Sequence, residues 1–217
     1  MAENSECTAR ELTGSGLRGA PRCRLIMRFY KGKGTYQAMA AQFVSSPVHV
    51  DYVLDKENSP HRRVCFSAYM REKFSMTLMP HEMVHDPLYD NWAVDITESD
   101  FERLYDFLHG MVDKTPYNYS DSLMLLPTIP HGGTFVDTLV TDLDRGITPC
   151  KISSVFCSQA GVLACRECIK DSPWLGGLVE RLLCVNSRLC SPFDLLSIVR
   201  PYASGITNAE LECVVDS

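Results

Sequence analysis

Cys157 is the residue of this chain best placed to act as a nucleophile. It lies in the segment Ser153-Ser154-Val155-Phe156-Cys157-Ser158-Gln159, where small, polar and apolar residues lead into the predicted first turn of a helix. The unpaired backbone N–H groups and the positive dipole end of a helix N-terminus favour a thiolate over a thiol, and they lower a cysteine pKa from about 8.5 towards neutrality. The sequence therefore predicts an activated thiol at this position.

A thiol nucleophile needs a base to accept its proton, and His49 is the best candidate. It lies in Val48-His49-Val50-Asp51-Tyr52-Val53-Leu54, a run that is typical of a β-strand. Because the pleat of a strand fixes the direction of each side chain, this strand would hold the imidazole in one orientation. His49 and Cys157 are therefore a candidate catalytic dyad.

The composition is that of a globular chain of 217 residues, long enough for one domain with a complete core. Hydrophobic residues make up 45% and charged residues 22%, which excludes wholesale disorder. The formal net charge is −6, and no run of Lys or Arg creates a local basic patch. This charge would repel a phosphate backbone, so we expect no nucleic-acid partner.

The N-terminal residues, Met1-Ala2-Glu3-Asn4-Ser5-Glu6, are polar and acidic, and no apolar signal segment follows them. No stretch reaches the roughly 18–20 apolar residues that cross a bilayer. We therefore expect a cytoplasmic protein without a membrane span. In that reducing compartment, most of the ten cysteines should be free thiols that pack as small hydrophobic side chains.

Hydrophobic patterning predicts the secondary structure of most of the chain. Strands are expected at residues 24–30, 48–54, 64–70, 74–79 and 91–96, and helices at 35–45, 97–112, 157–169, 175–185 and 191–199. Residues 116–149 lack a lasting periodicity and are expected to form a functional loop, an active-site lid or a mobile region. Consecutive strands followed by helices are typical of an α+β fold. We expect one domain over residues 23–200, between a flexible N-terminal tail (1–22) and a C-terminal tail (201–217).

Several of these pieces occur in the order typical of a known enzyme family. They are His49 at the start of a strand, Phe66-Ser67-Ala68-Tyr69 in a strand, Trp92 before a helix, Thr115-Pro116-Tyr117-Asn118-Tyr119, Phe156-Cys157-Ser158-Gln159 and Ser191-Pro192-Phe193-Asp194-Leu195-Leu196. Over residues 23–199 the chain resembles the circularly permuted branch of the NlpC-type papain-like cysteine hydrolases and acyltransferases. In that branch the histidine strand comes first and the cysteine helix last, and its uncharacterised members include proteins of large DNA viruses.

The resemblance implies a circularly permuted papain-like fold, in which an antiparallel sheet packs against helices and the nucleophile lies at a helix N-terminus. It also implies a thiol hydrolase or acyltransferase that needs no cofactor. The substrate would be a peptide or lipid acyl compound, with an amide, ester or thioester as the reacting group. An oxyanion would be stabilised by the backbone N–H of Cys157 and a neighbouring donor.

The resemblance assigns roles to individual side chains. The catalytic residues would be Cys157, His49 and Ser67, and the substrate-binding residues Tyr117 and Tyr119. Members of the family commonly carry His, Glu, Asp or another polar residue on the strand after the histidine, where this chain offers only Ser67. Asp51 and His61 are rivals for orienting the imidazole, although Asp51 would have to reach along its own strand.

Other interpretations stay open at the level of the sequence. The same fold could serve a catalytically inactive binding or structural protein, such as a virion or scaffold component, or a protease of ubiquitin-like conjugates. Two groups have metal-binding residue types: His81, Glu82 and His85, and Cys165, Cys168, Cys184 and Cys190. The flanking prolines of the first group and the uneven spacing of the second favour ordinary packing, so we expect no metal site.

Overall fold

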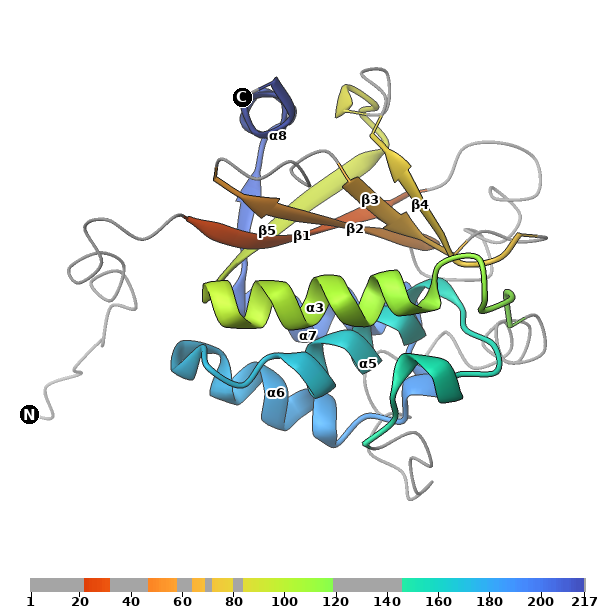
Figure 1. Ribbon diagram of the computed structural model, residues 1–217. Coiled ribbons are helices and arrows are strands. Elements are labelled where there is room, and N and C mark those ends of the chain that lie inside the picture. Colours follow the sequence, from red (N-terminus) through yellow and green to blue (C-terminus); the bar gives the residue numbers. More distant parts are fainter. Residues whose placement is uncertain are drawn as a thin grey trace, which may run out of the picture.

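The computed structural model describes residues 22–31, 47–57, 64–68, 72–79, 84–118 and 146–216. The helix expected at 35–45, nearly all of the expected N-terminal tail and most of the loop expected at 116–149 lie outside these residues. The described part is an α+β fold, as the sequence predicts. Its antiparallel sheet lies between a layer of helices and a C-terminal helix (Figure 1).

The sheet has six strands among the described residues, in the order β4-β3-β2-β1-β5-β6. Their bounds are β1 (Cys23–Tyr30), β2 (His49–Lys56), β3 (Val64–Ser67), β4 (Ser75–Leu78), β5 (Tyr89–Ile96) and β6 (Ser204–Ile206). Each neighbouring pair is antiparallel. The register of β1 places Tyr30 opposite His49 on one side and opposite Tyr89 on the other. His49 therefore lies in the last row of the paired region, at the end of the central strands.

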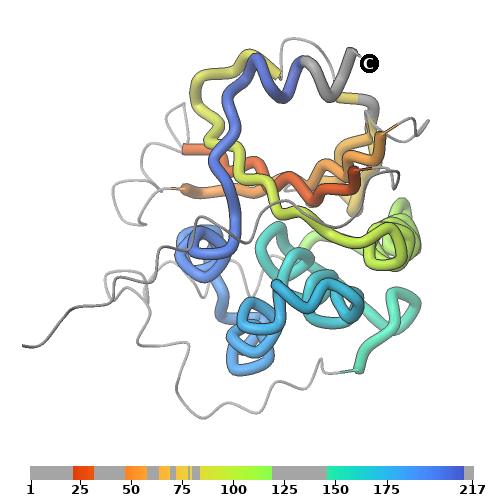
Figure 2. The backbone as a smooth tube through the Cα atoms, turned by 90° about the vertical axis from the view of Figure 1, so that its left-hand side faces the viewer, coloured from red at the N-terminus to blue at the C-terminus, as the bar shows by residue number. Residues whose placement is uncertain are grey.

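Four α-helices among the described residues lie on one face of the sheet: α3 (Glu98–Met111), α5 (Cys157–Cys168), α6 (Gly176–Leu183) and α7 (Pro192–Val199). α3 and α5 contact the strands, and α6 and α7 pack against α5. The fifth, α8 (Asn208–Asp216), lies on the opposite face, as Figure 2 shows. Short 3-10 helices occur at Pro149–Lys151, Pro173–Leu175, Ser187–Leu189 and Arg200–Tyr202. Within the described residues, no helix has the length and apolar character needed to cross a bilayer.

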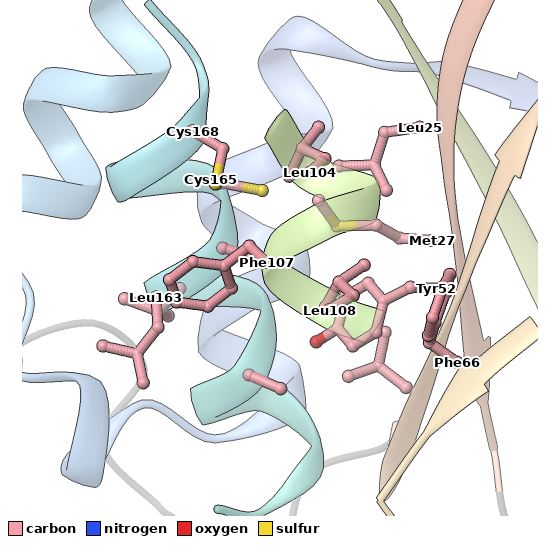
Figure 3. Packing of buried hydrophobic residues seen from close by; sticks show 14 of the residues in the cluster. Leu25, Met27, Tyr52, Phe66, Leu104, Phe107, Leu108, Leu163, Cys165 and Cys168 are labelled. Atoms are coloured by element: carbon pink, nitrogen blue, oxygen red, sulfur yellow. The ribbon is translucent and has the colours of Figure 1, made fainter. Parts of the chain in front are cut away.

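The pleat of β2 divides its side chains between two buried clusters. Tyr52 points toward the helices and packs in the main core with Leu108 of α3 (Figure 3). Val53 belongs to a second cluster on the other face, together with Leu211 of α8. Because both faces of β2 are covered, a polar residue such as Asp51 on the second face is also buried.

α3 and α7 begin at N-cap residues that are the first residues of the helix ranges expected from the sequence, 97–112 and 191–199. Thr97 accepts a hydrogen bond from the Asp100 N–H at 3.2 Å at the start of α3. At α7, the Ser191 hydroxyl accepts from the Asp194 N–H at 3.1 Å, and the Asp194 carboxylate accepts from the Ser191 N–H at 3.0 Å. Pro192 takes the first helical position, where its missing N–H needs no partner. Local sequence is therefore sufficient to define where these helices start.

α5 connects the sheet to the candidate nucleophile, and eleven of its twelve residues are buried. Phe156 precedes it in an extended conformation, and its N–H donates to Gln159 Oε1 at 3.4 Å. Tyr52 of β2 donates its hydroxyl hydrogen to the carbonyl of Cys157 at 2.7 Å. Gly161 lies one turn further along, where any Cβ would overlap the Tyr52 hydroxyl. The missing side chain at Gly161 is therefore what lets Tyr52 reach α5.

The structure differs from the sequence prediction at residues 201–217, which the sequence analysis assigns to a tail. β6 forms there and pairs with β5, and α8 follows. Leu211 of α8 is fully buried against the second face of the sheet. A three-residue strand has no apolar alternation of its own, so its pairing with β5 defines it and local sequence cannot.

We predict that Gly161→Ala destabilises the protein and loosens the contact between β2 and α5. Overpacking of a core typically costs about 1–3 kcal/mol. Ala has a higher helix propensity than Gly, which stabilises the helix by about 1 kcal/mol. The net loss in the free energy of unfolding should reach about 2 kcal/mol, measured by urea denaturation.

Gly176→Ala is the matched control, because a Cβ at Gly176 of α6 would meet no atom within 4 Å. This variant should be as stable as the parent or slightly more stable. Equal effects of the two substitutions would show that the contact between Tyr52 and α5 does not constrain the fold.

Candidate active site

His49 is the first residue of β2, and two polar side chains hold its imidazole. Its Nε2 lies 2.8 Å from Asp51 Oδ1 and 3.1 Å from Ser67 Oγ. A carboxylate only accepts hydrogen bonds, so Nε2 carries a hydrogen and donates it to Asp51. Nδ1 is then the nitrogen that can take a proton from a thiol. The His49 side chain is 15% exposed, so water competes little for these bonds.

Asp51 is a fully buried carboxylate with donors at both of its oxygens. Oδ1 accepts from His49 and from the Ser67 hydroxyl, and Oδ2 accepts from the Tyr89 hydroxyl at 3.0 Å. Burial by itself raises the pKa of Asp51, but the His49 charge and the three donated hydrogen bonds lower it below its usual value. Asp51 is therefore ionised at neutral pH and oriented toward the imidazole.

Cys157 meets His49 although the two residues are far apart in the sequence. It is the first residue of α5 and is 4% exposed. Burial lowers the pKa of His49, but the negative charges of Asp51 and of the Cys157 thiolate, with hydrogen bonds to both, raise it to about 10. The structure thus brings Cys157 close enough to the imidazole of His49 to raise its pKa, and a buried carboxylate holds that imidazole in place.

The start of α5 also supplies backbone donors beside the thiol. The first N–H groups of a helix have no acceptor within the helix, and the N-cap residue Phe156 offers no side-chain hydrogen bond to them. Ser158 donates its hydroxyl hydrogen to the Cys190 carbonyl at 2.6 Å, which fixes the first turn to the segment before α7. Rigid N–H groups next to a nucleophile are the arrangement that stabilises an oxyanion.

Tyr117 lies beside the segment that leads into α5. It forms a parallel bridge with Val155, whose N–H donates to the Pro116 carbonyl at 3.0 Å. The Asn118 N–H donates to the Val155 carbonyl at 2.9 Å. Tyr117 is partly buried and packs against the main core. Its backbone runs beside Val155, two residues before Cys157. Tyr119 lies outside the described residues.

The other described cysteines lie in different surroundings. Burial raises the pKa values of five thiols, those of Cys23, Cys65, Cys165, Cys168 and Cys190. These thiols are therefore protonated at neutral pH and act as packing groups. Cys150 and Cys184 are exposed.

No group of three or more His, Cys, Asp or Glu side chains in the described part of the chain could hold a metal ion. Cys165 and Cys168 are buried on α5, as core residues of that helix. His85 lies 3.2 Å from a carboxylate oxygen of Glu212 on α8. His61, His81 and Glu82 fall outside the described residues.

Asp51 lies closer to the imidazole than Ser67, the residue that the family resemblance assigns to the third position. Residues two apart on a strand share a face, so the spacing of His49 and Asp51 was the signal for this contact. Ser67 does lie beside His49, where its hydroxyl bridges to the carboxylate. The sequence contains no comparable signal for Tyr89 and Tyr52. Tyr89 contacts a residue of another strand, and Tyr52 contacts a helix in another layer.

Comparisons of the chain with protein-family models, with curated proteins and with solved structures found no match. The site is therefore interpreted from its own geometry.

We predict that the protein loses stability relative to His49→Gln as the pH rises from about 6.5 to about 10. The pKa of His49 is higher in the folded protein than in the unfolded chain. Protonated His49 therefore stabilises the fold fully at a pH below its unfolded-state pKa, and this contribution disappears as the pH rises through its folded-state pKa. Urea denaturation followed by tryptophan fluorescence at several pH values measures this difference. Parallel curves for the parent and His49→Gln would contradict the prediction.

Asp51→Asn should slow alkylation of Cys157 at pH 6 more than Ser67→Ala does. The first change removes both the charge and the acceptor that stabilise the imidazolium, and a hydrogen bond between charged groups corresponds to roughly tenfold or more in rate. The second removes one neutral donor, and we expect less than about tenfold. Rates measured by mass spectrometry decide the order, and a larger loss in Ser67→Ala would make Ser67 the principal orienting residue.

Proposed function

We propose that this protein is a cysteine hydrolase or acyltransferase that acts on an amide, ester or thioester. Cys157 is the nucleophile, His49 is the general acid and base, and Asp51 with Ser67 orients the imidazole. The observation that carries the proposal is the imidazole of His49, which lies 2.8 Å from the buried carboxylate of Asp51 and close enough to Cys157 for this residue to raise its pKa. A helix start, a strand start and a buried carboxylate converge at this imidazole, and a thiol that only packs needs none of these partners.

The proposed reaction follows from the positions of these groups. In the reactive form, His49 holds the proton of the Cys157 thiol as an imidazolium, in line with its raised pKa, and Sγ attacks the carbonyl carbon of the substrate. The carbonyl oxygen becomes an oxyanion, which the backbone N–H groups at the start of α5 stabilise. The imidazolium then gives its proton to the departing amine, alcohol or thiol. Water or an amine attacks the acyl-enzyme, His49 accepts its proton, and the thiolate is released and reprotonated.

Asp51 supports both halves of this cycle. Its carboxylate stabilises the positive charge that develops on His49 when the thiol is deprotonated, and it keeps Nε2 protonated so that Nδ1 faces the reaction. The Ser67 hydroxyl donates to the same carboxylate oxygen and holds it in place. A carboxylate supported in this way stabilises an imidazolium better than a lone hydroxyl can.

We also propose that the fold is the circularly permuted papain-like one. The support is the order of the elements: the histidine strand β2 precedes the cysteine helix α5, and an antiparallel sheet packs against the helix layer. The same fold serves peptide, lipid and acyl-transfer chemistry, so the acyl donor has to be found by experiment.

The first test is brief alkylation with iodoacetamide at pH 6, followed by mass mapping. We expect Cys157 to react faster than Cys150 and Cys184, although it is far less exposed, because His49 can take its proton. His49→Gln should abolish this advantage and leave the rates of the two exposed cysteines unchanged. Labelling of the exposed cysteines with Cys157 left unmodified would favour a catalytically inactive binding or structural protein.

The second test measures acyl transfer directly with p-nitrophenyl acetate. One equivalent of p-nitrophenolate should appear in a burst while the acetyl group is found on Cys157 by mass spectrometry. Cys157→Ala should lose the burst, and Cys165→Ala, which removes a buried thiol of the same helix, should retain it. A burst that survives Cys157→Ala would place the nucleophile elsewhere.

A further inference from the structure

A second set of contacts fixes Asp51 from the side away from His49. The imidazole and the Ser67 hydroxyl both use Oδ1, so Oδ2 depends on a different donor. That donor is the hydroxyl of Tyr89, at 3.0 Å. Tyr89 is the first residue of β5, and β1 separates β5 from β2, so the phenol reaches across a whole strand.

The Tyr89 ring is itself held by a buried cation. The guanidinium of Arg28 on β1 lies 4.2 Å from the centre of the ring, and the residue is fully buried. Arg28 Nε donates to Asn91 Oδ1 at 3.1 Å, and the Asn91 amide donates to Asn208 Oδ1 at 2.9 Å. Asn208 is the first residue of α8. A chain of buried and partly buried polar contacts therefore leads from the C-terminal helix to the carboxylate of the site.

We infer that Tyr89 is a positioning residue of the proposed catalytic site, acting on His49 through Asp51, with Arg28 and the start of α8 as its support. This inference rests on the proposed function. A carboxylate held at one oxygen can rotate about its terminal bond, and the imidazole then loses a fixed partner. The Tyr89 hydroxyl prevents that rotation because it holds the other oxygen.

The charged and titratable groups that face Asp51 come from every strand near it. They are His49 on its own strand, Arg28 on β1, Cys65 on β3 and Tyr89 on β5, with Cys157 of α5 behind the imidazole. Burial, with a smaller contribution from Asp51, raises the pKa of Cys65, so this thiol stays neutral. Asp51 is therefore the group whose protonation at low pH removes support from His49.

The test is the pH dependence of Cys157 alkylation by iodoacetamide between pH 2 and pH 8, in the full-length protein, because the lowered pKa of Asp51 places the acid limb below pH 4. Tyr89→Phe keeps the ring beneath Arg28 and removes only the hydroxyl. Because the Tyr89 hydrogen bond lowers the pKa of Asp51, its loss should move the acid limb of the rate profile upward. We expect a shift of roughly one pH unit, the size of one lost hydrogen bond to a carboxylate.

Tyr30→Phe is the matched control, because the Tyr30 ring lies 5.0 Å from the Tyr89 ring in the same row of the sheet. It should leave the profile where it is. A variant that only weakened the fold would lower the unfolding temperature without moving the acid limb, so thermal unfolding is measured in parallel.

The outcomes separate the two proposals. If Cys157 of the parent shows no enhanced alkylation at pH 6, the proposed function fails. If the parent reacts as expected and Tyr89→Phe has the same profile, the role of Tyr89 is wrong and the function stands. If Tyr89→Phe does not fold, Asn208→Ala is tested in its place, because it removes the hydrogen-bond acceptor of the Asn91 amide. This variant should move the acid limb in the same direction by a smaller amount. An unchanged acid limb would overturn the inference.

Discussion

The contact between Tyr52 and α5 is the constraint on which the site depends. Tyr52 stands on β2, next to Asp51 and three residues after His49, and its hydroxyl holds the carbonyl of Cys157. Gly161 leaves the space that this hydroxyl occupies. One strand thus carries both the base and the side chain that fixes the nucleophile helix. The distance between thiol and imidazole is therefore set by one rigid unit, with no loop between the two supports.

Buried charge on the other face of the sheet is the second constraint. Arg28 and Asp51 are fully buried and oppose each other in the register of β1 and β2. Taking charged groups out of water is expensive unless each finds hydrogen-bond partners. Every buried side-chain nitrogen and oxygen of the described residues has one. The polar cluster is therefore satisfied, and its geometry is fixed by strands and α8 together.

Local signals in the sequence were enough for the long elements. The strands expected at 24–30 and 48–54 correspond to β1 and β2, and the helices expected at 97–112 and 191–199 start at the N-cap residues of α3 and α7. β6 and α8 were missed because their stability comes from contacts with other elements. β6 has three residues and exists as the partner of β5, and α8 buries Leu211 against a sheet face that no local pattern reveals.

The sequence by itself determined the two ends of the candidate dyad, a cysteine at a helix start and a histidine at a strand start, because both are properties of neighbouring residues. Only the tertiary structure decided that they meet, since that depends on how α5 packs on β2. It also placed Asp51 closer to the imidazole than Ser67, and it added Tyr89 from two strands away. Hydrogen bonds select partners by distance in space, and for residues on different strands that distance is fixed by sheet register and helix packing.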